Sequence, residues 1–381
     1  MFRSLFACAA LTVFAAAHSL ADAPATPIPT APQVDARSYI VVDFHTGKVL
    51  AEKDATTREE PASLTKLMTA YFVFQELESG KLKLGDQVTV SEHAWRSEGS
   101  RSFVELGKPV SVQDLILGMV VQSGNDATIA LAEHIAGTEE TFAQLMNANA
   151  KRLGMVGTHF ENSTGLPSPQ HFTTARDLSL LAVAIIREFP EYYKWFSVRE
   201  FEHNGIKQQN RNGLLGRDPG VDGLKTGHTD SAGYCLVTSG LRDGMRLVSV
   251  VMGATSTKGR ENASAALLNY GYTFYDTKLA VKGGTVLATS RVWKAQRSPV
   301  ELGISNDLYV TLPRGAAAGI KTVTAVTPRL IAPLAVNADV GSVQVLSGSQ
   351  VVATAPLHPL KAVAAGGWWR RLIDTIRLWF V

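Results

Sequence analysis

Strand-like segments flank a long helical region in this chain, and that arrangement limits its fold more than any other feature. Residues 38–54 read as a β-hairpin, and three further strand patterns follow between residues 221 and 254. Between them, apolar residues recur at helical spacing at 112–121, 126–136, 140–152 and around 175–188. Because strands at both ends must meet across inserted helices, we predict an α+β fold in which an antiparallel sheet packs against helices.

The texture of the sequence changes near residue 285, where short β-rich runs separated by Gly and Pro replace the helical pattern. We therefore expect a main domain at 37–284, a small all-β domain at 285–360 and a linker at 361–367. The small domain carries no cluster of titratable side chains. This composition favours a spacer or interaction role for it.

The first 21 residues have the features of a secretory signal peptide. Arg3 supplies a basic start, residues 5–17 are nearly all apolar, and the segment ends in a small-x-small pattern at Ala21. A buried N-terminal helix is the alternative, but a Pro-rich spacer at 22–36 follows at once and would not continue a core helix. We expect an exported protein, cleaved near Ala21.

Residues 368–381 follow a Gly-Gly hinge and form a strongly amphipathic segment when placed on a helix. One side carries Trp369, Leu372, Ile373, Ile376, Trp379 and Phe380, and the other carries Arg370, Arg371, Asp374 and Arg377. Such a helix lies in the membrane interface, and no mature segment has the ~20 apolar residues that a spanning helix needs. The alternative is a helix docked on the small β domain. We expect peripheral attachment to a membrane surface.

Charge and cysteine content exclude several classes of protein. The net charge of +3 over 381 residues is too small to indicate a nucleic-acid binder. Cys8 lies in the signal peptide, so the mature chain keeps only Cys235, which sits in an apolar run and reads as a core residue. One cysteine forms neither an internal disulfide nor a zinc site.

Residues 61–69, PASLTKLMT, place Ser63 and Lys66 three positions apart where a helix begins. Lys66 returns to the face of Ser63 after one turn, and the helix N-terminus stabilises an anion on the hydroxyl. A serine needs an adjacent base, and a lysine serves as one when burial or nearby cations lower its pKa. The alternative is that Ser63 caps the helix and Lys66 points to water, since roughly one such match arises by chance at this length.

Two further motifs supply the remaining groups of an acyl-transfer site. The run QSGNDA places Ser123 and Asn125 in a tight turn between helices, and VDGLKTGHT places Lys225, Thr226 and Gly227 on a strand. Ser123 would relay a proton between Lys66 and a leaving group. Asn125 would hold a substrate amide. Alone, each motif reads more readily as a helix cap or as turn punctuation.

Lys225 is expected to add a second positive charge, which would lower the pKa of Lys66 and attract a substrate carboxylate. The strand that carries Lys225 would bind an extended peptide along its edge. Its flanking amides, together with the backbone N–H of Ser63, would form an oxyanion hole. Gly227 would let the substrate approach the strand closely.

Ser-x-x-Lys, Ser-x-Asn and Lys-Thr-Gly in this order are the signature of penicillin-binding proteins and serine β-lactamases. With NRNGLL and VMGATSTKGRE in addition, the chain resembles the low-molecular-mass penicillin-binding proteins that are D-alanyl-D-alanine carboxypeptidases. The resemblance runs from about residue 35 to the end of the chain. It implies a β-lactamase/transpeptidase-like domain, a small all-β C-terminal domain and an amphipathic membrane anchor.

The same resemblance implies an enzyme without metal or cofactor on the periplasmic face of the inner membrane. It would remove the terminal D-Ala of peptidoglycan stem pentapeptides through an acyl-enzyme on Ser63, and β-lactam antibiotics would acylate the same serine. Lys66 matches the general base of the family, and Ser123, Asn125, Lys225, Thr226 and Gly227 match its remaining active-site positions.

Four further positions match residues of the family outside its three motifs. His228 is typical of the carboxypeptidases and would shape the rim of the strand. Arg211 and Arg260 match arginines near the carboxylate end of the substrate, for which the planar guanidinium is suited; a surface salt bridge is the alternative for each. Asp177 matches a position that we interpret as structural.

The segment RSEGSRSF, which flanks the expected site, is shorter than in relatives, so deacylation rate and substrate preference remain open. Three other functions are compatible with the same three motifs. A D,D-endopeptidase would cut cross-links. A serine β-lactamase is disfavoured because the only candidate for a Glu-x-x-x-Asn element, ENSTGL, places Asn directly after Glu161. A catalytically idle wall-peptide-binding scaffold would not need the complete set of catalytic residues.

Overall fold

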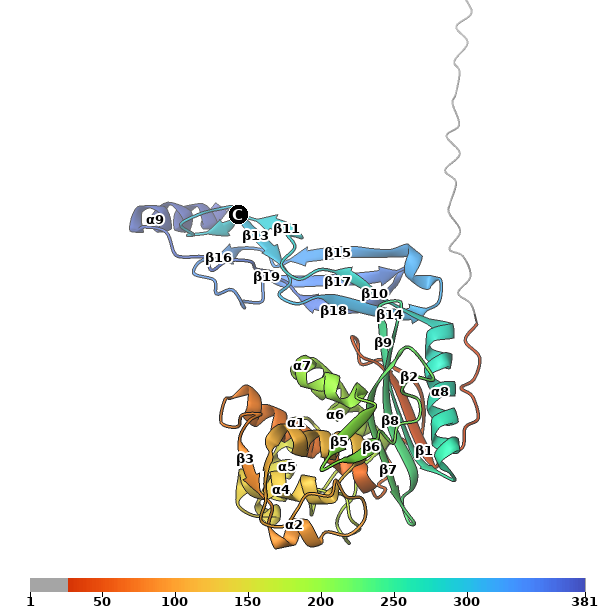
Figure 1. The fold of residues 1–381 in the computed structure, drawn as a ribbon. Helices are drawn as coiled ribbons and strands as arrows, with labels where there is room; N and C mark the ends of the chain where they lie inside the picture. Colours follow the sequence, from red (N-terminus) through yellow and green to blue (C-terminus); the bar gives the residue numbers. More distant parts are fainter. Residues whose placement is uncertain (1–26, 381) are drawn as a thin grey trace, which may run out of the picture.

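The computed structural model describes residues 27–380, so the predicted signal peptide at 1–21 lies outside them. The central sheet is antiparallel, with strand order β2–β1–β9–β8–β7 (Figure 1). The N-terminal hairpin therefore pairs with strands from beyond the helices, which confirms the predicted α+β class. The five strands are β1 (Ser38–Asp43), β2 (Val49–Lys53), β7 (Val221–Thr229), β8 (Gly233–Arg242) and β9 (Met245–Ala254).

Helices cover both faces of this sheet. Strand β1 alternates between them: Ile40 belongs to the apolar cluster on the side of α1 and α6, and Val41 belongs to the cluster under α8. This alternation is what a sheet between two helical layers requires. The helices are α1 (Lys66–Glu78), α2 (Glu92–Arg96), α3 (Val112–Leu117), α4 (Asn125–Ala136), α5 (Glu139–Arg152), α6 (Ala175–Glu188), α7 (Pro190–Tyr193) and α8 (Thr257–Phe274).

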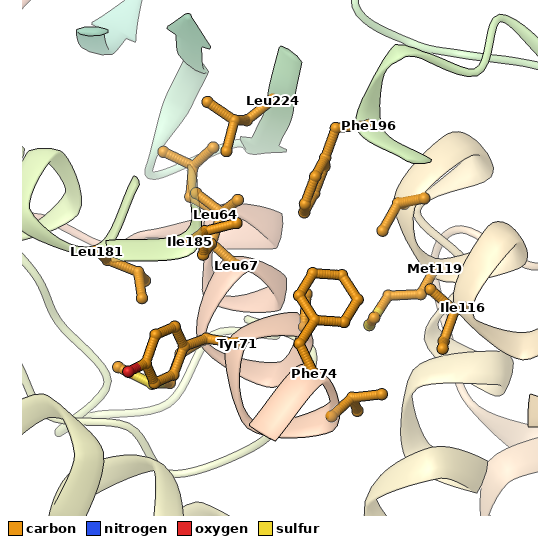
Figure 2. Packing of buried hydrophobic residues seen from close by; sticks show 14 of the residues in the cluster. Leu64, Leu67, Tyr71, Phe74, Ile116, Met119, Leu181, Ile185, Phe196 and Leu224 are labelled. Carbon is orange, nitrogen blue, oxygen red and sulfur yellow. The ribbon is translucent and has the colours of Figure 1, made fainter. Parts of the chain in front are cut away.

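Helix α1 runs through the interior of the helical layer. Tyr71 and Phe74 are fully buried among side chains of α3, α6 and the short helix η3 (Lys194–Ser197), as Figure 2 shows. Burial of one such side chain contributes about 1.5–3 kcal/mol. The packing fixes the start of α1, preceded by the 3₁₀ turn η1 (Ala62–Thr65), against strand β7.

Two small two-stranded sheets, which the sequence patterns did not predict, border the helical layer. One of them is the hairpin of residues 200–209, which packs on the loop at 98–106: Gln208 donates to the carbonyl of Ser102 at 3.1 Å, and Asn204 donates to that of Phe103 at 3.4 Å. This loop is thereby held between the hairpin and α4. The two sheets pair β3 (Gln87–Thr89) with β4 (Pro109–Ser111) and β5 (Glu200–His203) with β6 (Ile206–Gln209).

The small β-rich domain begins before residue 285, because β10 (Tyr275–Val281) pairs with β14 (Leu308–Pro313). The expected linker at 361–367 also packs on this domain, since Val363 bridges to Leu334. The remaining strands are β11 (Ala288–Ser290), β12 (Val292–Trp293), β13 (Val300–Gly303), β15 (Ile320–Val326), β16 (Leu330–Ile331), β17 (Gly341–Ser347), β18 (Gln350–Pro356) and β19 (His358–Pro359), with a 3₁₀ turn η4 (Ala316–Gly319).

A partly buried polar contact joins the two domains. Thr277 of β10 donates to Asp43 at 2.6 Å, and the hydroxyls of Thr46 and Thr311 lie 2.7 Å apart. The β-rich domain extends from this contact, and helix α9 (Trp368–Arg377), followed by the turn η5 (Leu378–Phe380), lies at its far end (Figure 1). The chain therefore places α9 well away from the central sheet.

Candidate active site

Ser63 lies in η1 at the entrance to α1, with Lys66 as the first residue of that helix. Nζ of Lys66 is 3.0 Å from Oγ of Ser63. Ala62, directly before the serine, has a φ of +47°, a conformation that costs a non-glycine residue about 1–3 kcal/mol and that clusters at functional sites. The predicted pair is thus in hydrogen-bond contact.

Lys66 is almost fully buried, with 1% of its surface exposed. The pKa of its ammonium is lowered from 10.5 to about 7. Burial is the largest cause and the charge of Arg211 adds to it, while the carboxylates of Glu139 and Asp126 oppose the shift. The sequence predicted Lys225 as the cause of this shift. Burial is instead the main cause, because a desolvated ammonium loses its hydration whatever its neighbours are.

Two carbonyl oxygens orient the amine of Lys66. Nζ lies 2.7 Å from Oδ1 of Asn125 and 2.7 Å from the backbone oxygen of Thr164, and both atoms only accept hydrogen bonds. A neutral amine has two N–H donors, which these carbonyls occupy. Its lone pair is then left for the hydroxyl proton of Ser63, as a general base requires.

Ser123 pairs with the other buried lysine. It follows the π-turn η2 (Gly118–Gln122) with a φ of +68°, and its Oγ accepts from Nζ of Lys225 at 2.9 Å. Burial lowers the pKa of Lys225 well below its ordinary value, and the nearby charges of Lys66, Arg211 and Arg260 add to this effect. The hydroxyl of Ser123 thus contacts Lys225, whereas the sequence led us to expect a link to Lys66.

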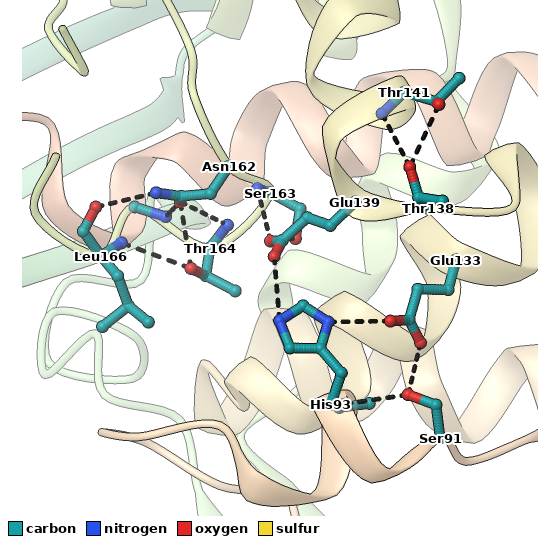
Figure 3. A network of polar contacts seen from close by, with 12 residues as sticks. Ser91, His93, Glu133, Thr138, Glu139, Thr141, Asn162, Ser163, Thr164 and Leu166 are labelled. Carbon is teal, nitrogen blue, oxygen red and sulfur yellow. Dashed lines mark hydrogen bonds and ion pairs between the residues drawn. The ribbon is translucent and has the colours of Figure 1, made fainter.

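The loop at 162–166 contributes to the site through its backbone. Asn162 accepts from the N–H groups of Thr164 and Gly165 at 3.2 and 2.7 Å, and Glu139 accepts from the N–H of Ser163 at 2.8 Å (Figure 3). These bonds present the carbonyl of Thr164 to Lys66. Sequence reasoning missed Thr164, because a carbonyl leaves no residue-type signal.

Asp126, directly after the Ser-x-Asn motif, ties the loop at 98–106 to the site. Its fully buried carboxylate accepts from the N–H groups of Ser102 and Phe103 at 2.7 and 2.9 Å. The same loop also contacts Asn125, whose Nδ2 donates to the carbonyl of Glu98 at 2.5 Å. Nothing in the sequence marks Asp126 as a functional residue beyond its place in the QSGNDA run.

Gly227 brings the strand and the serine segment together. A Cβ at this position would lie 3.0 Å from the carbonyl oxygen of Pro61 and 3.3 Å from Cβ of Ala62. The prediction that Gly227 makes room for the substrate therefore needs an addition: it makes room for the turn that carries Ser63. Strand β7 also contacts η1, and it is at the edge of the sheet, so only one of its sides is paired, with β8.

The two predicted arginines differ in their surroundings. Arg211 is exposed on the cavity wall, and none of the described carboxylates lies within ion-pair distance of it. Arg260 also lines the cavity but is only 5% exposed, and it donates to the carbonyl of Gly227 at 3.0 Å, so it supports β7. His228 is exposed at the rim, where its ring lies 4.0 Å from that of Tyr234. Asp177, in the first turn of α6, accepts from the N–H of Gly157 and the hydroxyl of Thr158, so it ties the 157–158 turn to that helix, as the structural interpretation implies.

A cavity of about 490 Å³ opens over these groups. It brings together most of the residues that the three motifs predicted, while Lys66 and Lys225 lie buried behind its wall. The lining residues are Ser63, Gly99, Ser100, Ser123, Asn125, Thr164, Gly165, Leu166, Arg211, Thr226, Gly227, His228, Thr229, Tyr234, Thr257 and Arg260.

A serine beside a buried lysine of lowered pKa, below the edge strand of an α+β sheet, defines a serine acyl-transfer enzyme. Residues 25–256 match the family model for D-alanyl-D-alanine carboxypeptidase, and residues 274–365 match that for the C-terminal domain of penicillin-binding protein 5. The chain therefore belongs to the peptidase S11 family of D-alanyl-D-alanine carboxypeptidases. Its enzyme class, domain types and cell-wall role are those that the sequence predicted.

Individual relatives agree with this assignment along nearly the whole chain. The D-alanyl-D-alanine carboxypeptidase DacA of Escherichia coli K12 is 41% identical over 363 residues, covering 93% of this chain and 90% of the relative. The crystal structure of penicillin-binding protein 5 from Haemophilus influenzae is 39% identical with a TM-score of 0.83, and 88% of this chain covers 99% of it. Penicillin-binding protein D2 of Listeria monocytogenes, solved in an ampicillin-bound form, is 32% identical with a TM-score of 0.59, covering 63% of this chain and 98% of that one.

Proposed function

We propose that Ser63 is the nucleophile of this carboxypeptidase and that Lys66 is its base. The observation that carries the proposal is the placement of Lys66 between two carbonyls, which leaves its lone pair for the Ser63 hydroxyl 3.0 Å away. Lys66 takes the hydroxyl proton while Oγ attacks the carbonyl carbon of the penultimate D-Ala. The negative charge that develops on the carbonyl oxygen is stabilised by backbone N–H groups of β7 and of Ser63.

The peptide nitrogen of the terminal D-Ala must gain a proton before it leaves. We assign this transfer to Ser123, whose hydroxyl is replenished by the ammonium of Lys225 at 2.9 Å. The C–N bond then breaks, D-Ala departs as an amine, and an ester on Ser63 remains. Water attacks that ester and gives one proton, through Ser123, to the now neutral amine of Lys225. The ammonium of Lys66 returns its proton to Oγ of Ser63 as the ester C–O bond breaks, which releases Ser63 and the shortened peptide.

The substrate we infer is the stem pentapeptide of peptidoglycan, extended along the free side of β7. Arg211 supports this assignment, because it lies on the cavity wall without a carboxylate partner among the described residues. A guanidinium in that position suits the terminal carboxylate of D-Ala. β-Lactams would acylate Ser63 in the same way, since the ampicillin-bound relative shares this fold.

Release of D-Ala from diacetyl-Lys-D-Ala-D-Ala tests the proposal directly. Wild-type enzyme should release D-Ala, Ser63→Ala should release none, and Ser349→Ala, an exposed serine in the β17–β18 turn, should match wild type. A fluorescent penicillin followed over time on a gel should label wild type and Ser349→Ala only. Labelling of folded Ser63→Ala would refute Ser63 as the nucleophile, and failure of wild type to release D-Ala would favour the binding-scaffold alternative.

We further infer that the mature enzyme is exported and attaches peripherally to the periplasmic face of the inner membrane through α9. Among the described residues, no helix is long and apolar enough to cross a bilayer. The apolar residues of the α9 region are exposed instead, up to 78% for Trp379 and 84% for Phe380. Exposed aromatic side chains on a short amphipathic helix are typical of segments that lie in the membrane interface.

A further inference from the structure

Positive charge is concentrated in the C-terminal part of the chain, which carries α9. Residues 285–381 contain ten Lys and Arg against four Asp and Glu, a surplus of six, whereas the whole chain has a net charge of only +3. The part of the chain before residue 285 is therefore net negative. Seven of the ten basic residues are arginines, which suit phosphate groups better than lysines do.

Helix α9 is docked by its polar side. Asp374 is 7% exposed, accepts from the backbone N–H of Lys294 at 2.6 Å and lies 3.6 Å from the guanidinium of Arg291. One turn earlier, Arg370 donates to the carbonyl of Gln296 at 3.1 Å. These contacts hold the polar side against the β-rich domain and leave the apolar residues of the helix largely exposed.

A cavity of about 760 Å³ lies in the seam between α9 and the β-rich domain. Its wall carries three arginines: Arg370 and Arg377 from the helix and Arg291 from the start of β12. Asp374 is the one acid among the lining residues, and it is already bonded to Lys294 and Arg291. Trp369 lines the same cavity at the border with the apolar side of the helix.

We propose that this cavity, the seam site, binds the phosphodiester of an anionic phospholipid of the membrane in which α9 lies. Arginine guanidinium groups bind phosphate oxygens through paired, charge-assisted hydrogen bonds. Trp369 places the cavity at the level of the lipid headgroups, where indole rings collect. Basic pockets beside membrane helices are a known way of holding acidic headgroups.

The charge of the seam site favours an anionic headgroup over a zwitterionic one. Three arginines surround one acid, so a choline or ethanolamine cation would meet net positive charge and find no free carboxylate among the lining residues. This inference rests on the proposed membrane attachment through α9. It is independent of the catalytic proposal, because the seam site lies at the far end of the β-rich domain (Figure 1).

Partition of the full mature chain onto vesicles tests the seam site. We compare pure phosphatidylcholine with an equimolar mixture of phosphatidylcholine and phosphatidylglycerol, at low and at high salt. Arg377→Gln removes a lining arginine, and Arg371→Gln is its matched control, because Arg371 is exposed on the same helix but does not line the cavity. Arg291→Gln removes a second lining arginine from outside the helix. D-Ala release by each variant verifies that it is folded.

We expect Arg377→Gln and Arg291→Gln to weaken binding to the mixed vesicles on the order of tenfold, also at high salt, because each loses a direct bond to phosphate. Arg371→Gln should lose about fivefold or less at low salt and nothing at high salt, as a screened surface charge does. Equal losses for Arg371→Gln and Arg377→Gln, or no preference of wild type for phosphatidylglycerol, would overturn the seam site. Absence of wild-type binding to either vesicle would overturn the membrane attachment itself.

Discussion

Oδ1 of Asn125 lies 2.7 Å from Nζ of Lys66, so a side chain expected to hold the substrate also holds the base. The other end of the same amide donates to the carbonyl of Glu98. Asn125 therefore fixes the direction in which Lys66 offers its lone pair. The rate of acylation should respond to anything that changes the charge at this contact.

The pH dependence of acylation is the first prediction. Lys66 acts as a base only when neutral, and its pKa is lowered from 10.5 to about 7. Acylation by a fluorescent penicillin should therefore rise with pH and level off above this value. Below it, the rate should fall about tenfold for each pH unit, because the protonated fraction grows in that proportion. A rate that stays level through this range, with circular dichroism unchanged, would contradict Lys66 as the base.

Asn125→Asp is the second prediction. The substitution keeps the shape of the side chain and places a carboxylate 2.7 Å from the Lys66 amine. An opposite charge at this distance raises the pKa of a lysine, by about 1–3 units in comparable pairs. The acylation profile should shift to higher pH, with a lower rate at neutral pH and recovery in alkaline buffer. Asn337→Asp, in the β-rich domain, is the control and should leave the profile where it is. A uniform loss of rate at every pH would show that the amide acts on the substrate alone.

Gly227→Ala is the third prediction. The added methyl would lie 3.0 Å from the carbonyl of Pro61, so either β7 or the turn that carries Ser63 has to move. Displacement of a nucleophile by a fraction of an ångström to one ångström costs on the order of a hundredfold in rate. We expect a loss of this size in the acylation rate. Gly85→Ala, where a Cβ meets nothing within 4 Å, should behave as wild type. A wild-type acylation rate in Gly227→Ala would show that the close approach of β7 to Pro61 is not required to position Ser63.

Much of the fold and the side-chain part of the site could be predicted from sequence, for reasons that particular residues make clear. Ser63 and Lys66 share one helical turn, and the Ser123 and Lys225 motifs have fixed internal spacing, so their chemistry is visible in the residue types. Thr164 acts through a backbone carbonyl, which every residue has. The strands of the two small sheets, β3 with β4 and β5 with β6, are too short to show a strand pattern in the sequence, and their pairing depends on tertiary contacts.

Residue roles that depend on packing could not be predicted from the sequence either. Gly227 is required by Pro61, far away in the chain, and only the folded structure shows the approach. The motif alone also led us to attribute the lowered pKa of Lys66 to Lys225, since charges can be counted in a sequence and burial cannot. The bond of Arg260 to the carbonyl of Gly227 is likewise visible only in the folded structure.

The fourth prediction is that Arg211 and Arg260 have different roles, substrate binding for Arg211 and stability for Arg260. Arg211→Gln should lower kcat/KM for a D-Ala-D-Ala peptide by roughly tenfold to a hundredfold, as expected for loss of a hydrogen bond between charged groups. It should have little effect on a peptide whose terminal carboxylate is amidated, which offers no charge to pair with. Arg260→Gln should instead lower the midpoint of urea unfolding, because its bond to the Gly227 carbonyl is buried. Equal losses on both peptides would show that Arg211 does not bind the carboxylate.

Asp126→Asn is the fifth prediction, and it concerns the loop at 98–106. The carboxylate accepts from the backbone N–H groups of Ser102 through Oδ1 and of Phe103 through Oδ2. An asparagine has one acceptor oxygen, so its NH₂ group would face one of these N–H donors without a bond between them. Loss of a hydrogen bond to a buried charge, with a donor left unpaired, should destabilise the protein by about 2–3 kcal/mol in urea unfolding.

Asp243→Asn is the matched control for this substitution, because Asp243 is exposed in the β8–β9 turn and undergoes the same chemical change. Its stability should stay within about 0.5 kcal/mol of wild type. Hydrogen exchange gives a second readout: in Asp126→Asn the amides of Ser102 and Phe103 should exchange faster, while those of α1 keep their protection as long as the protein stays folded. If both variants unfold at the wild-type urea midpoint, Asp126 does not hold this loop against the active site.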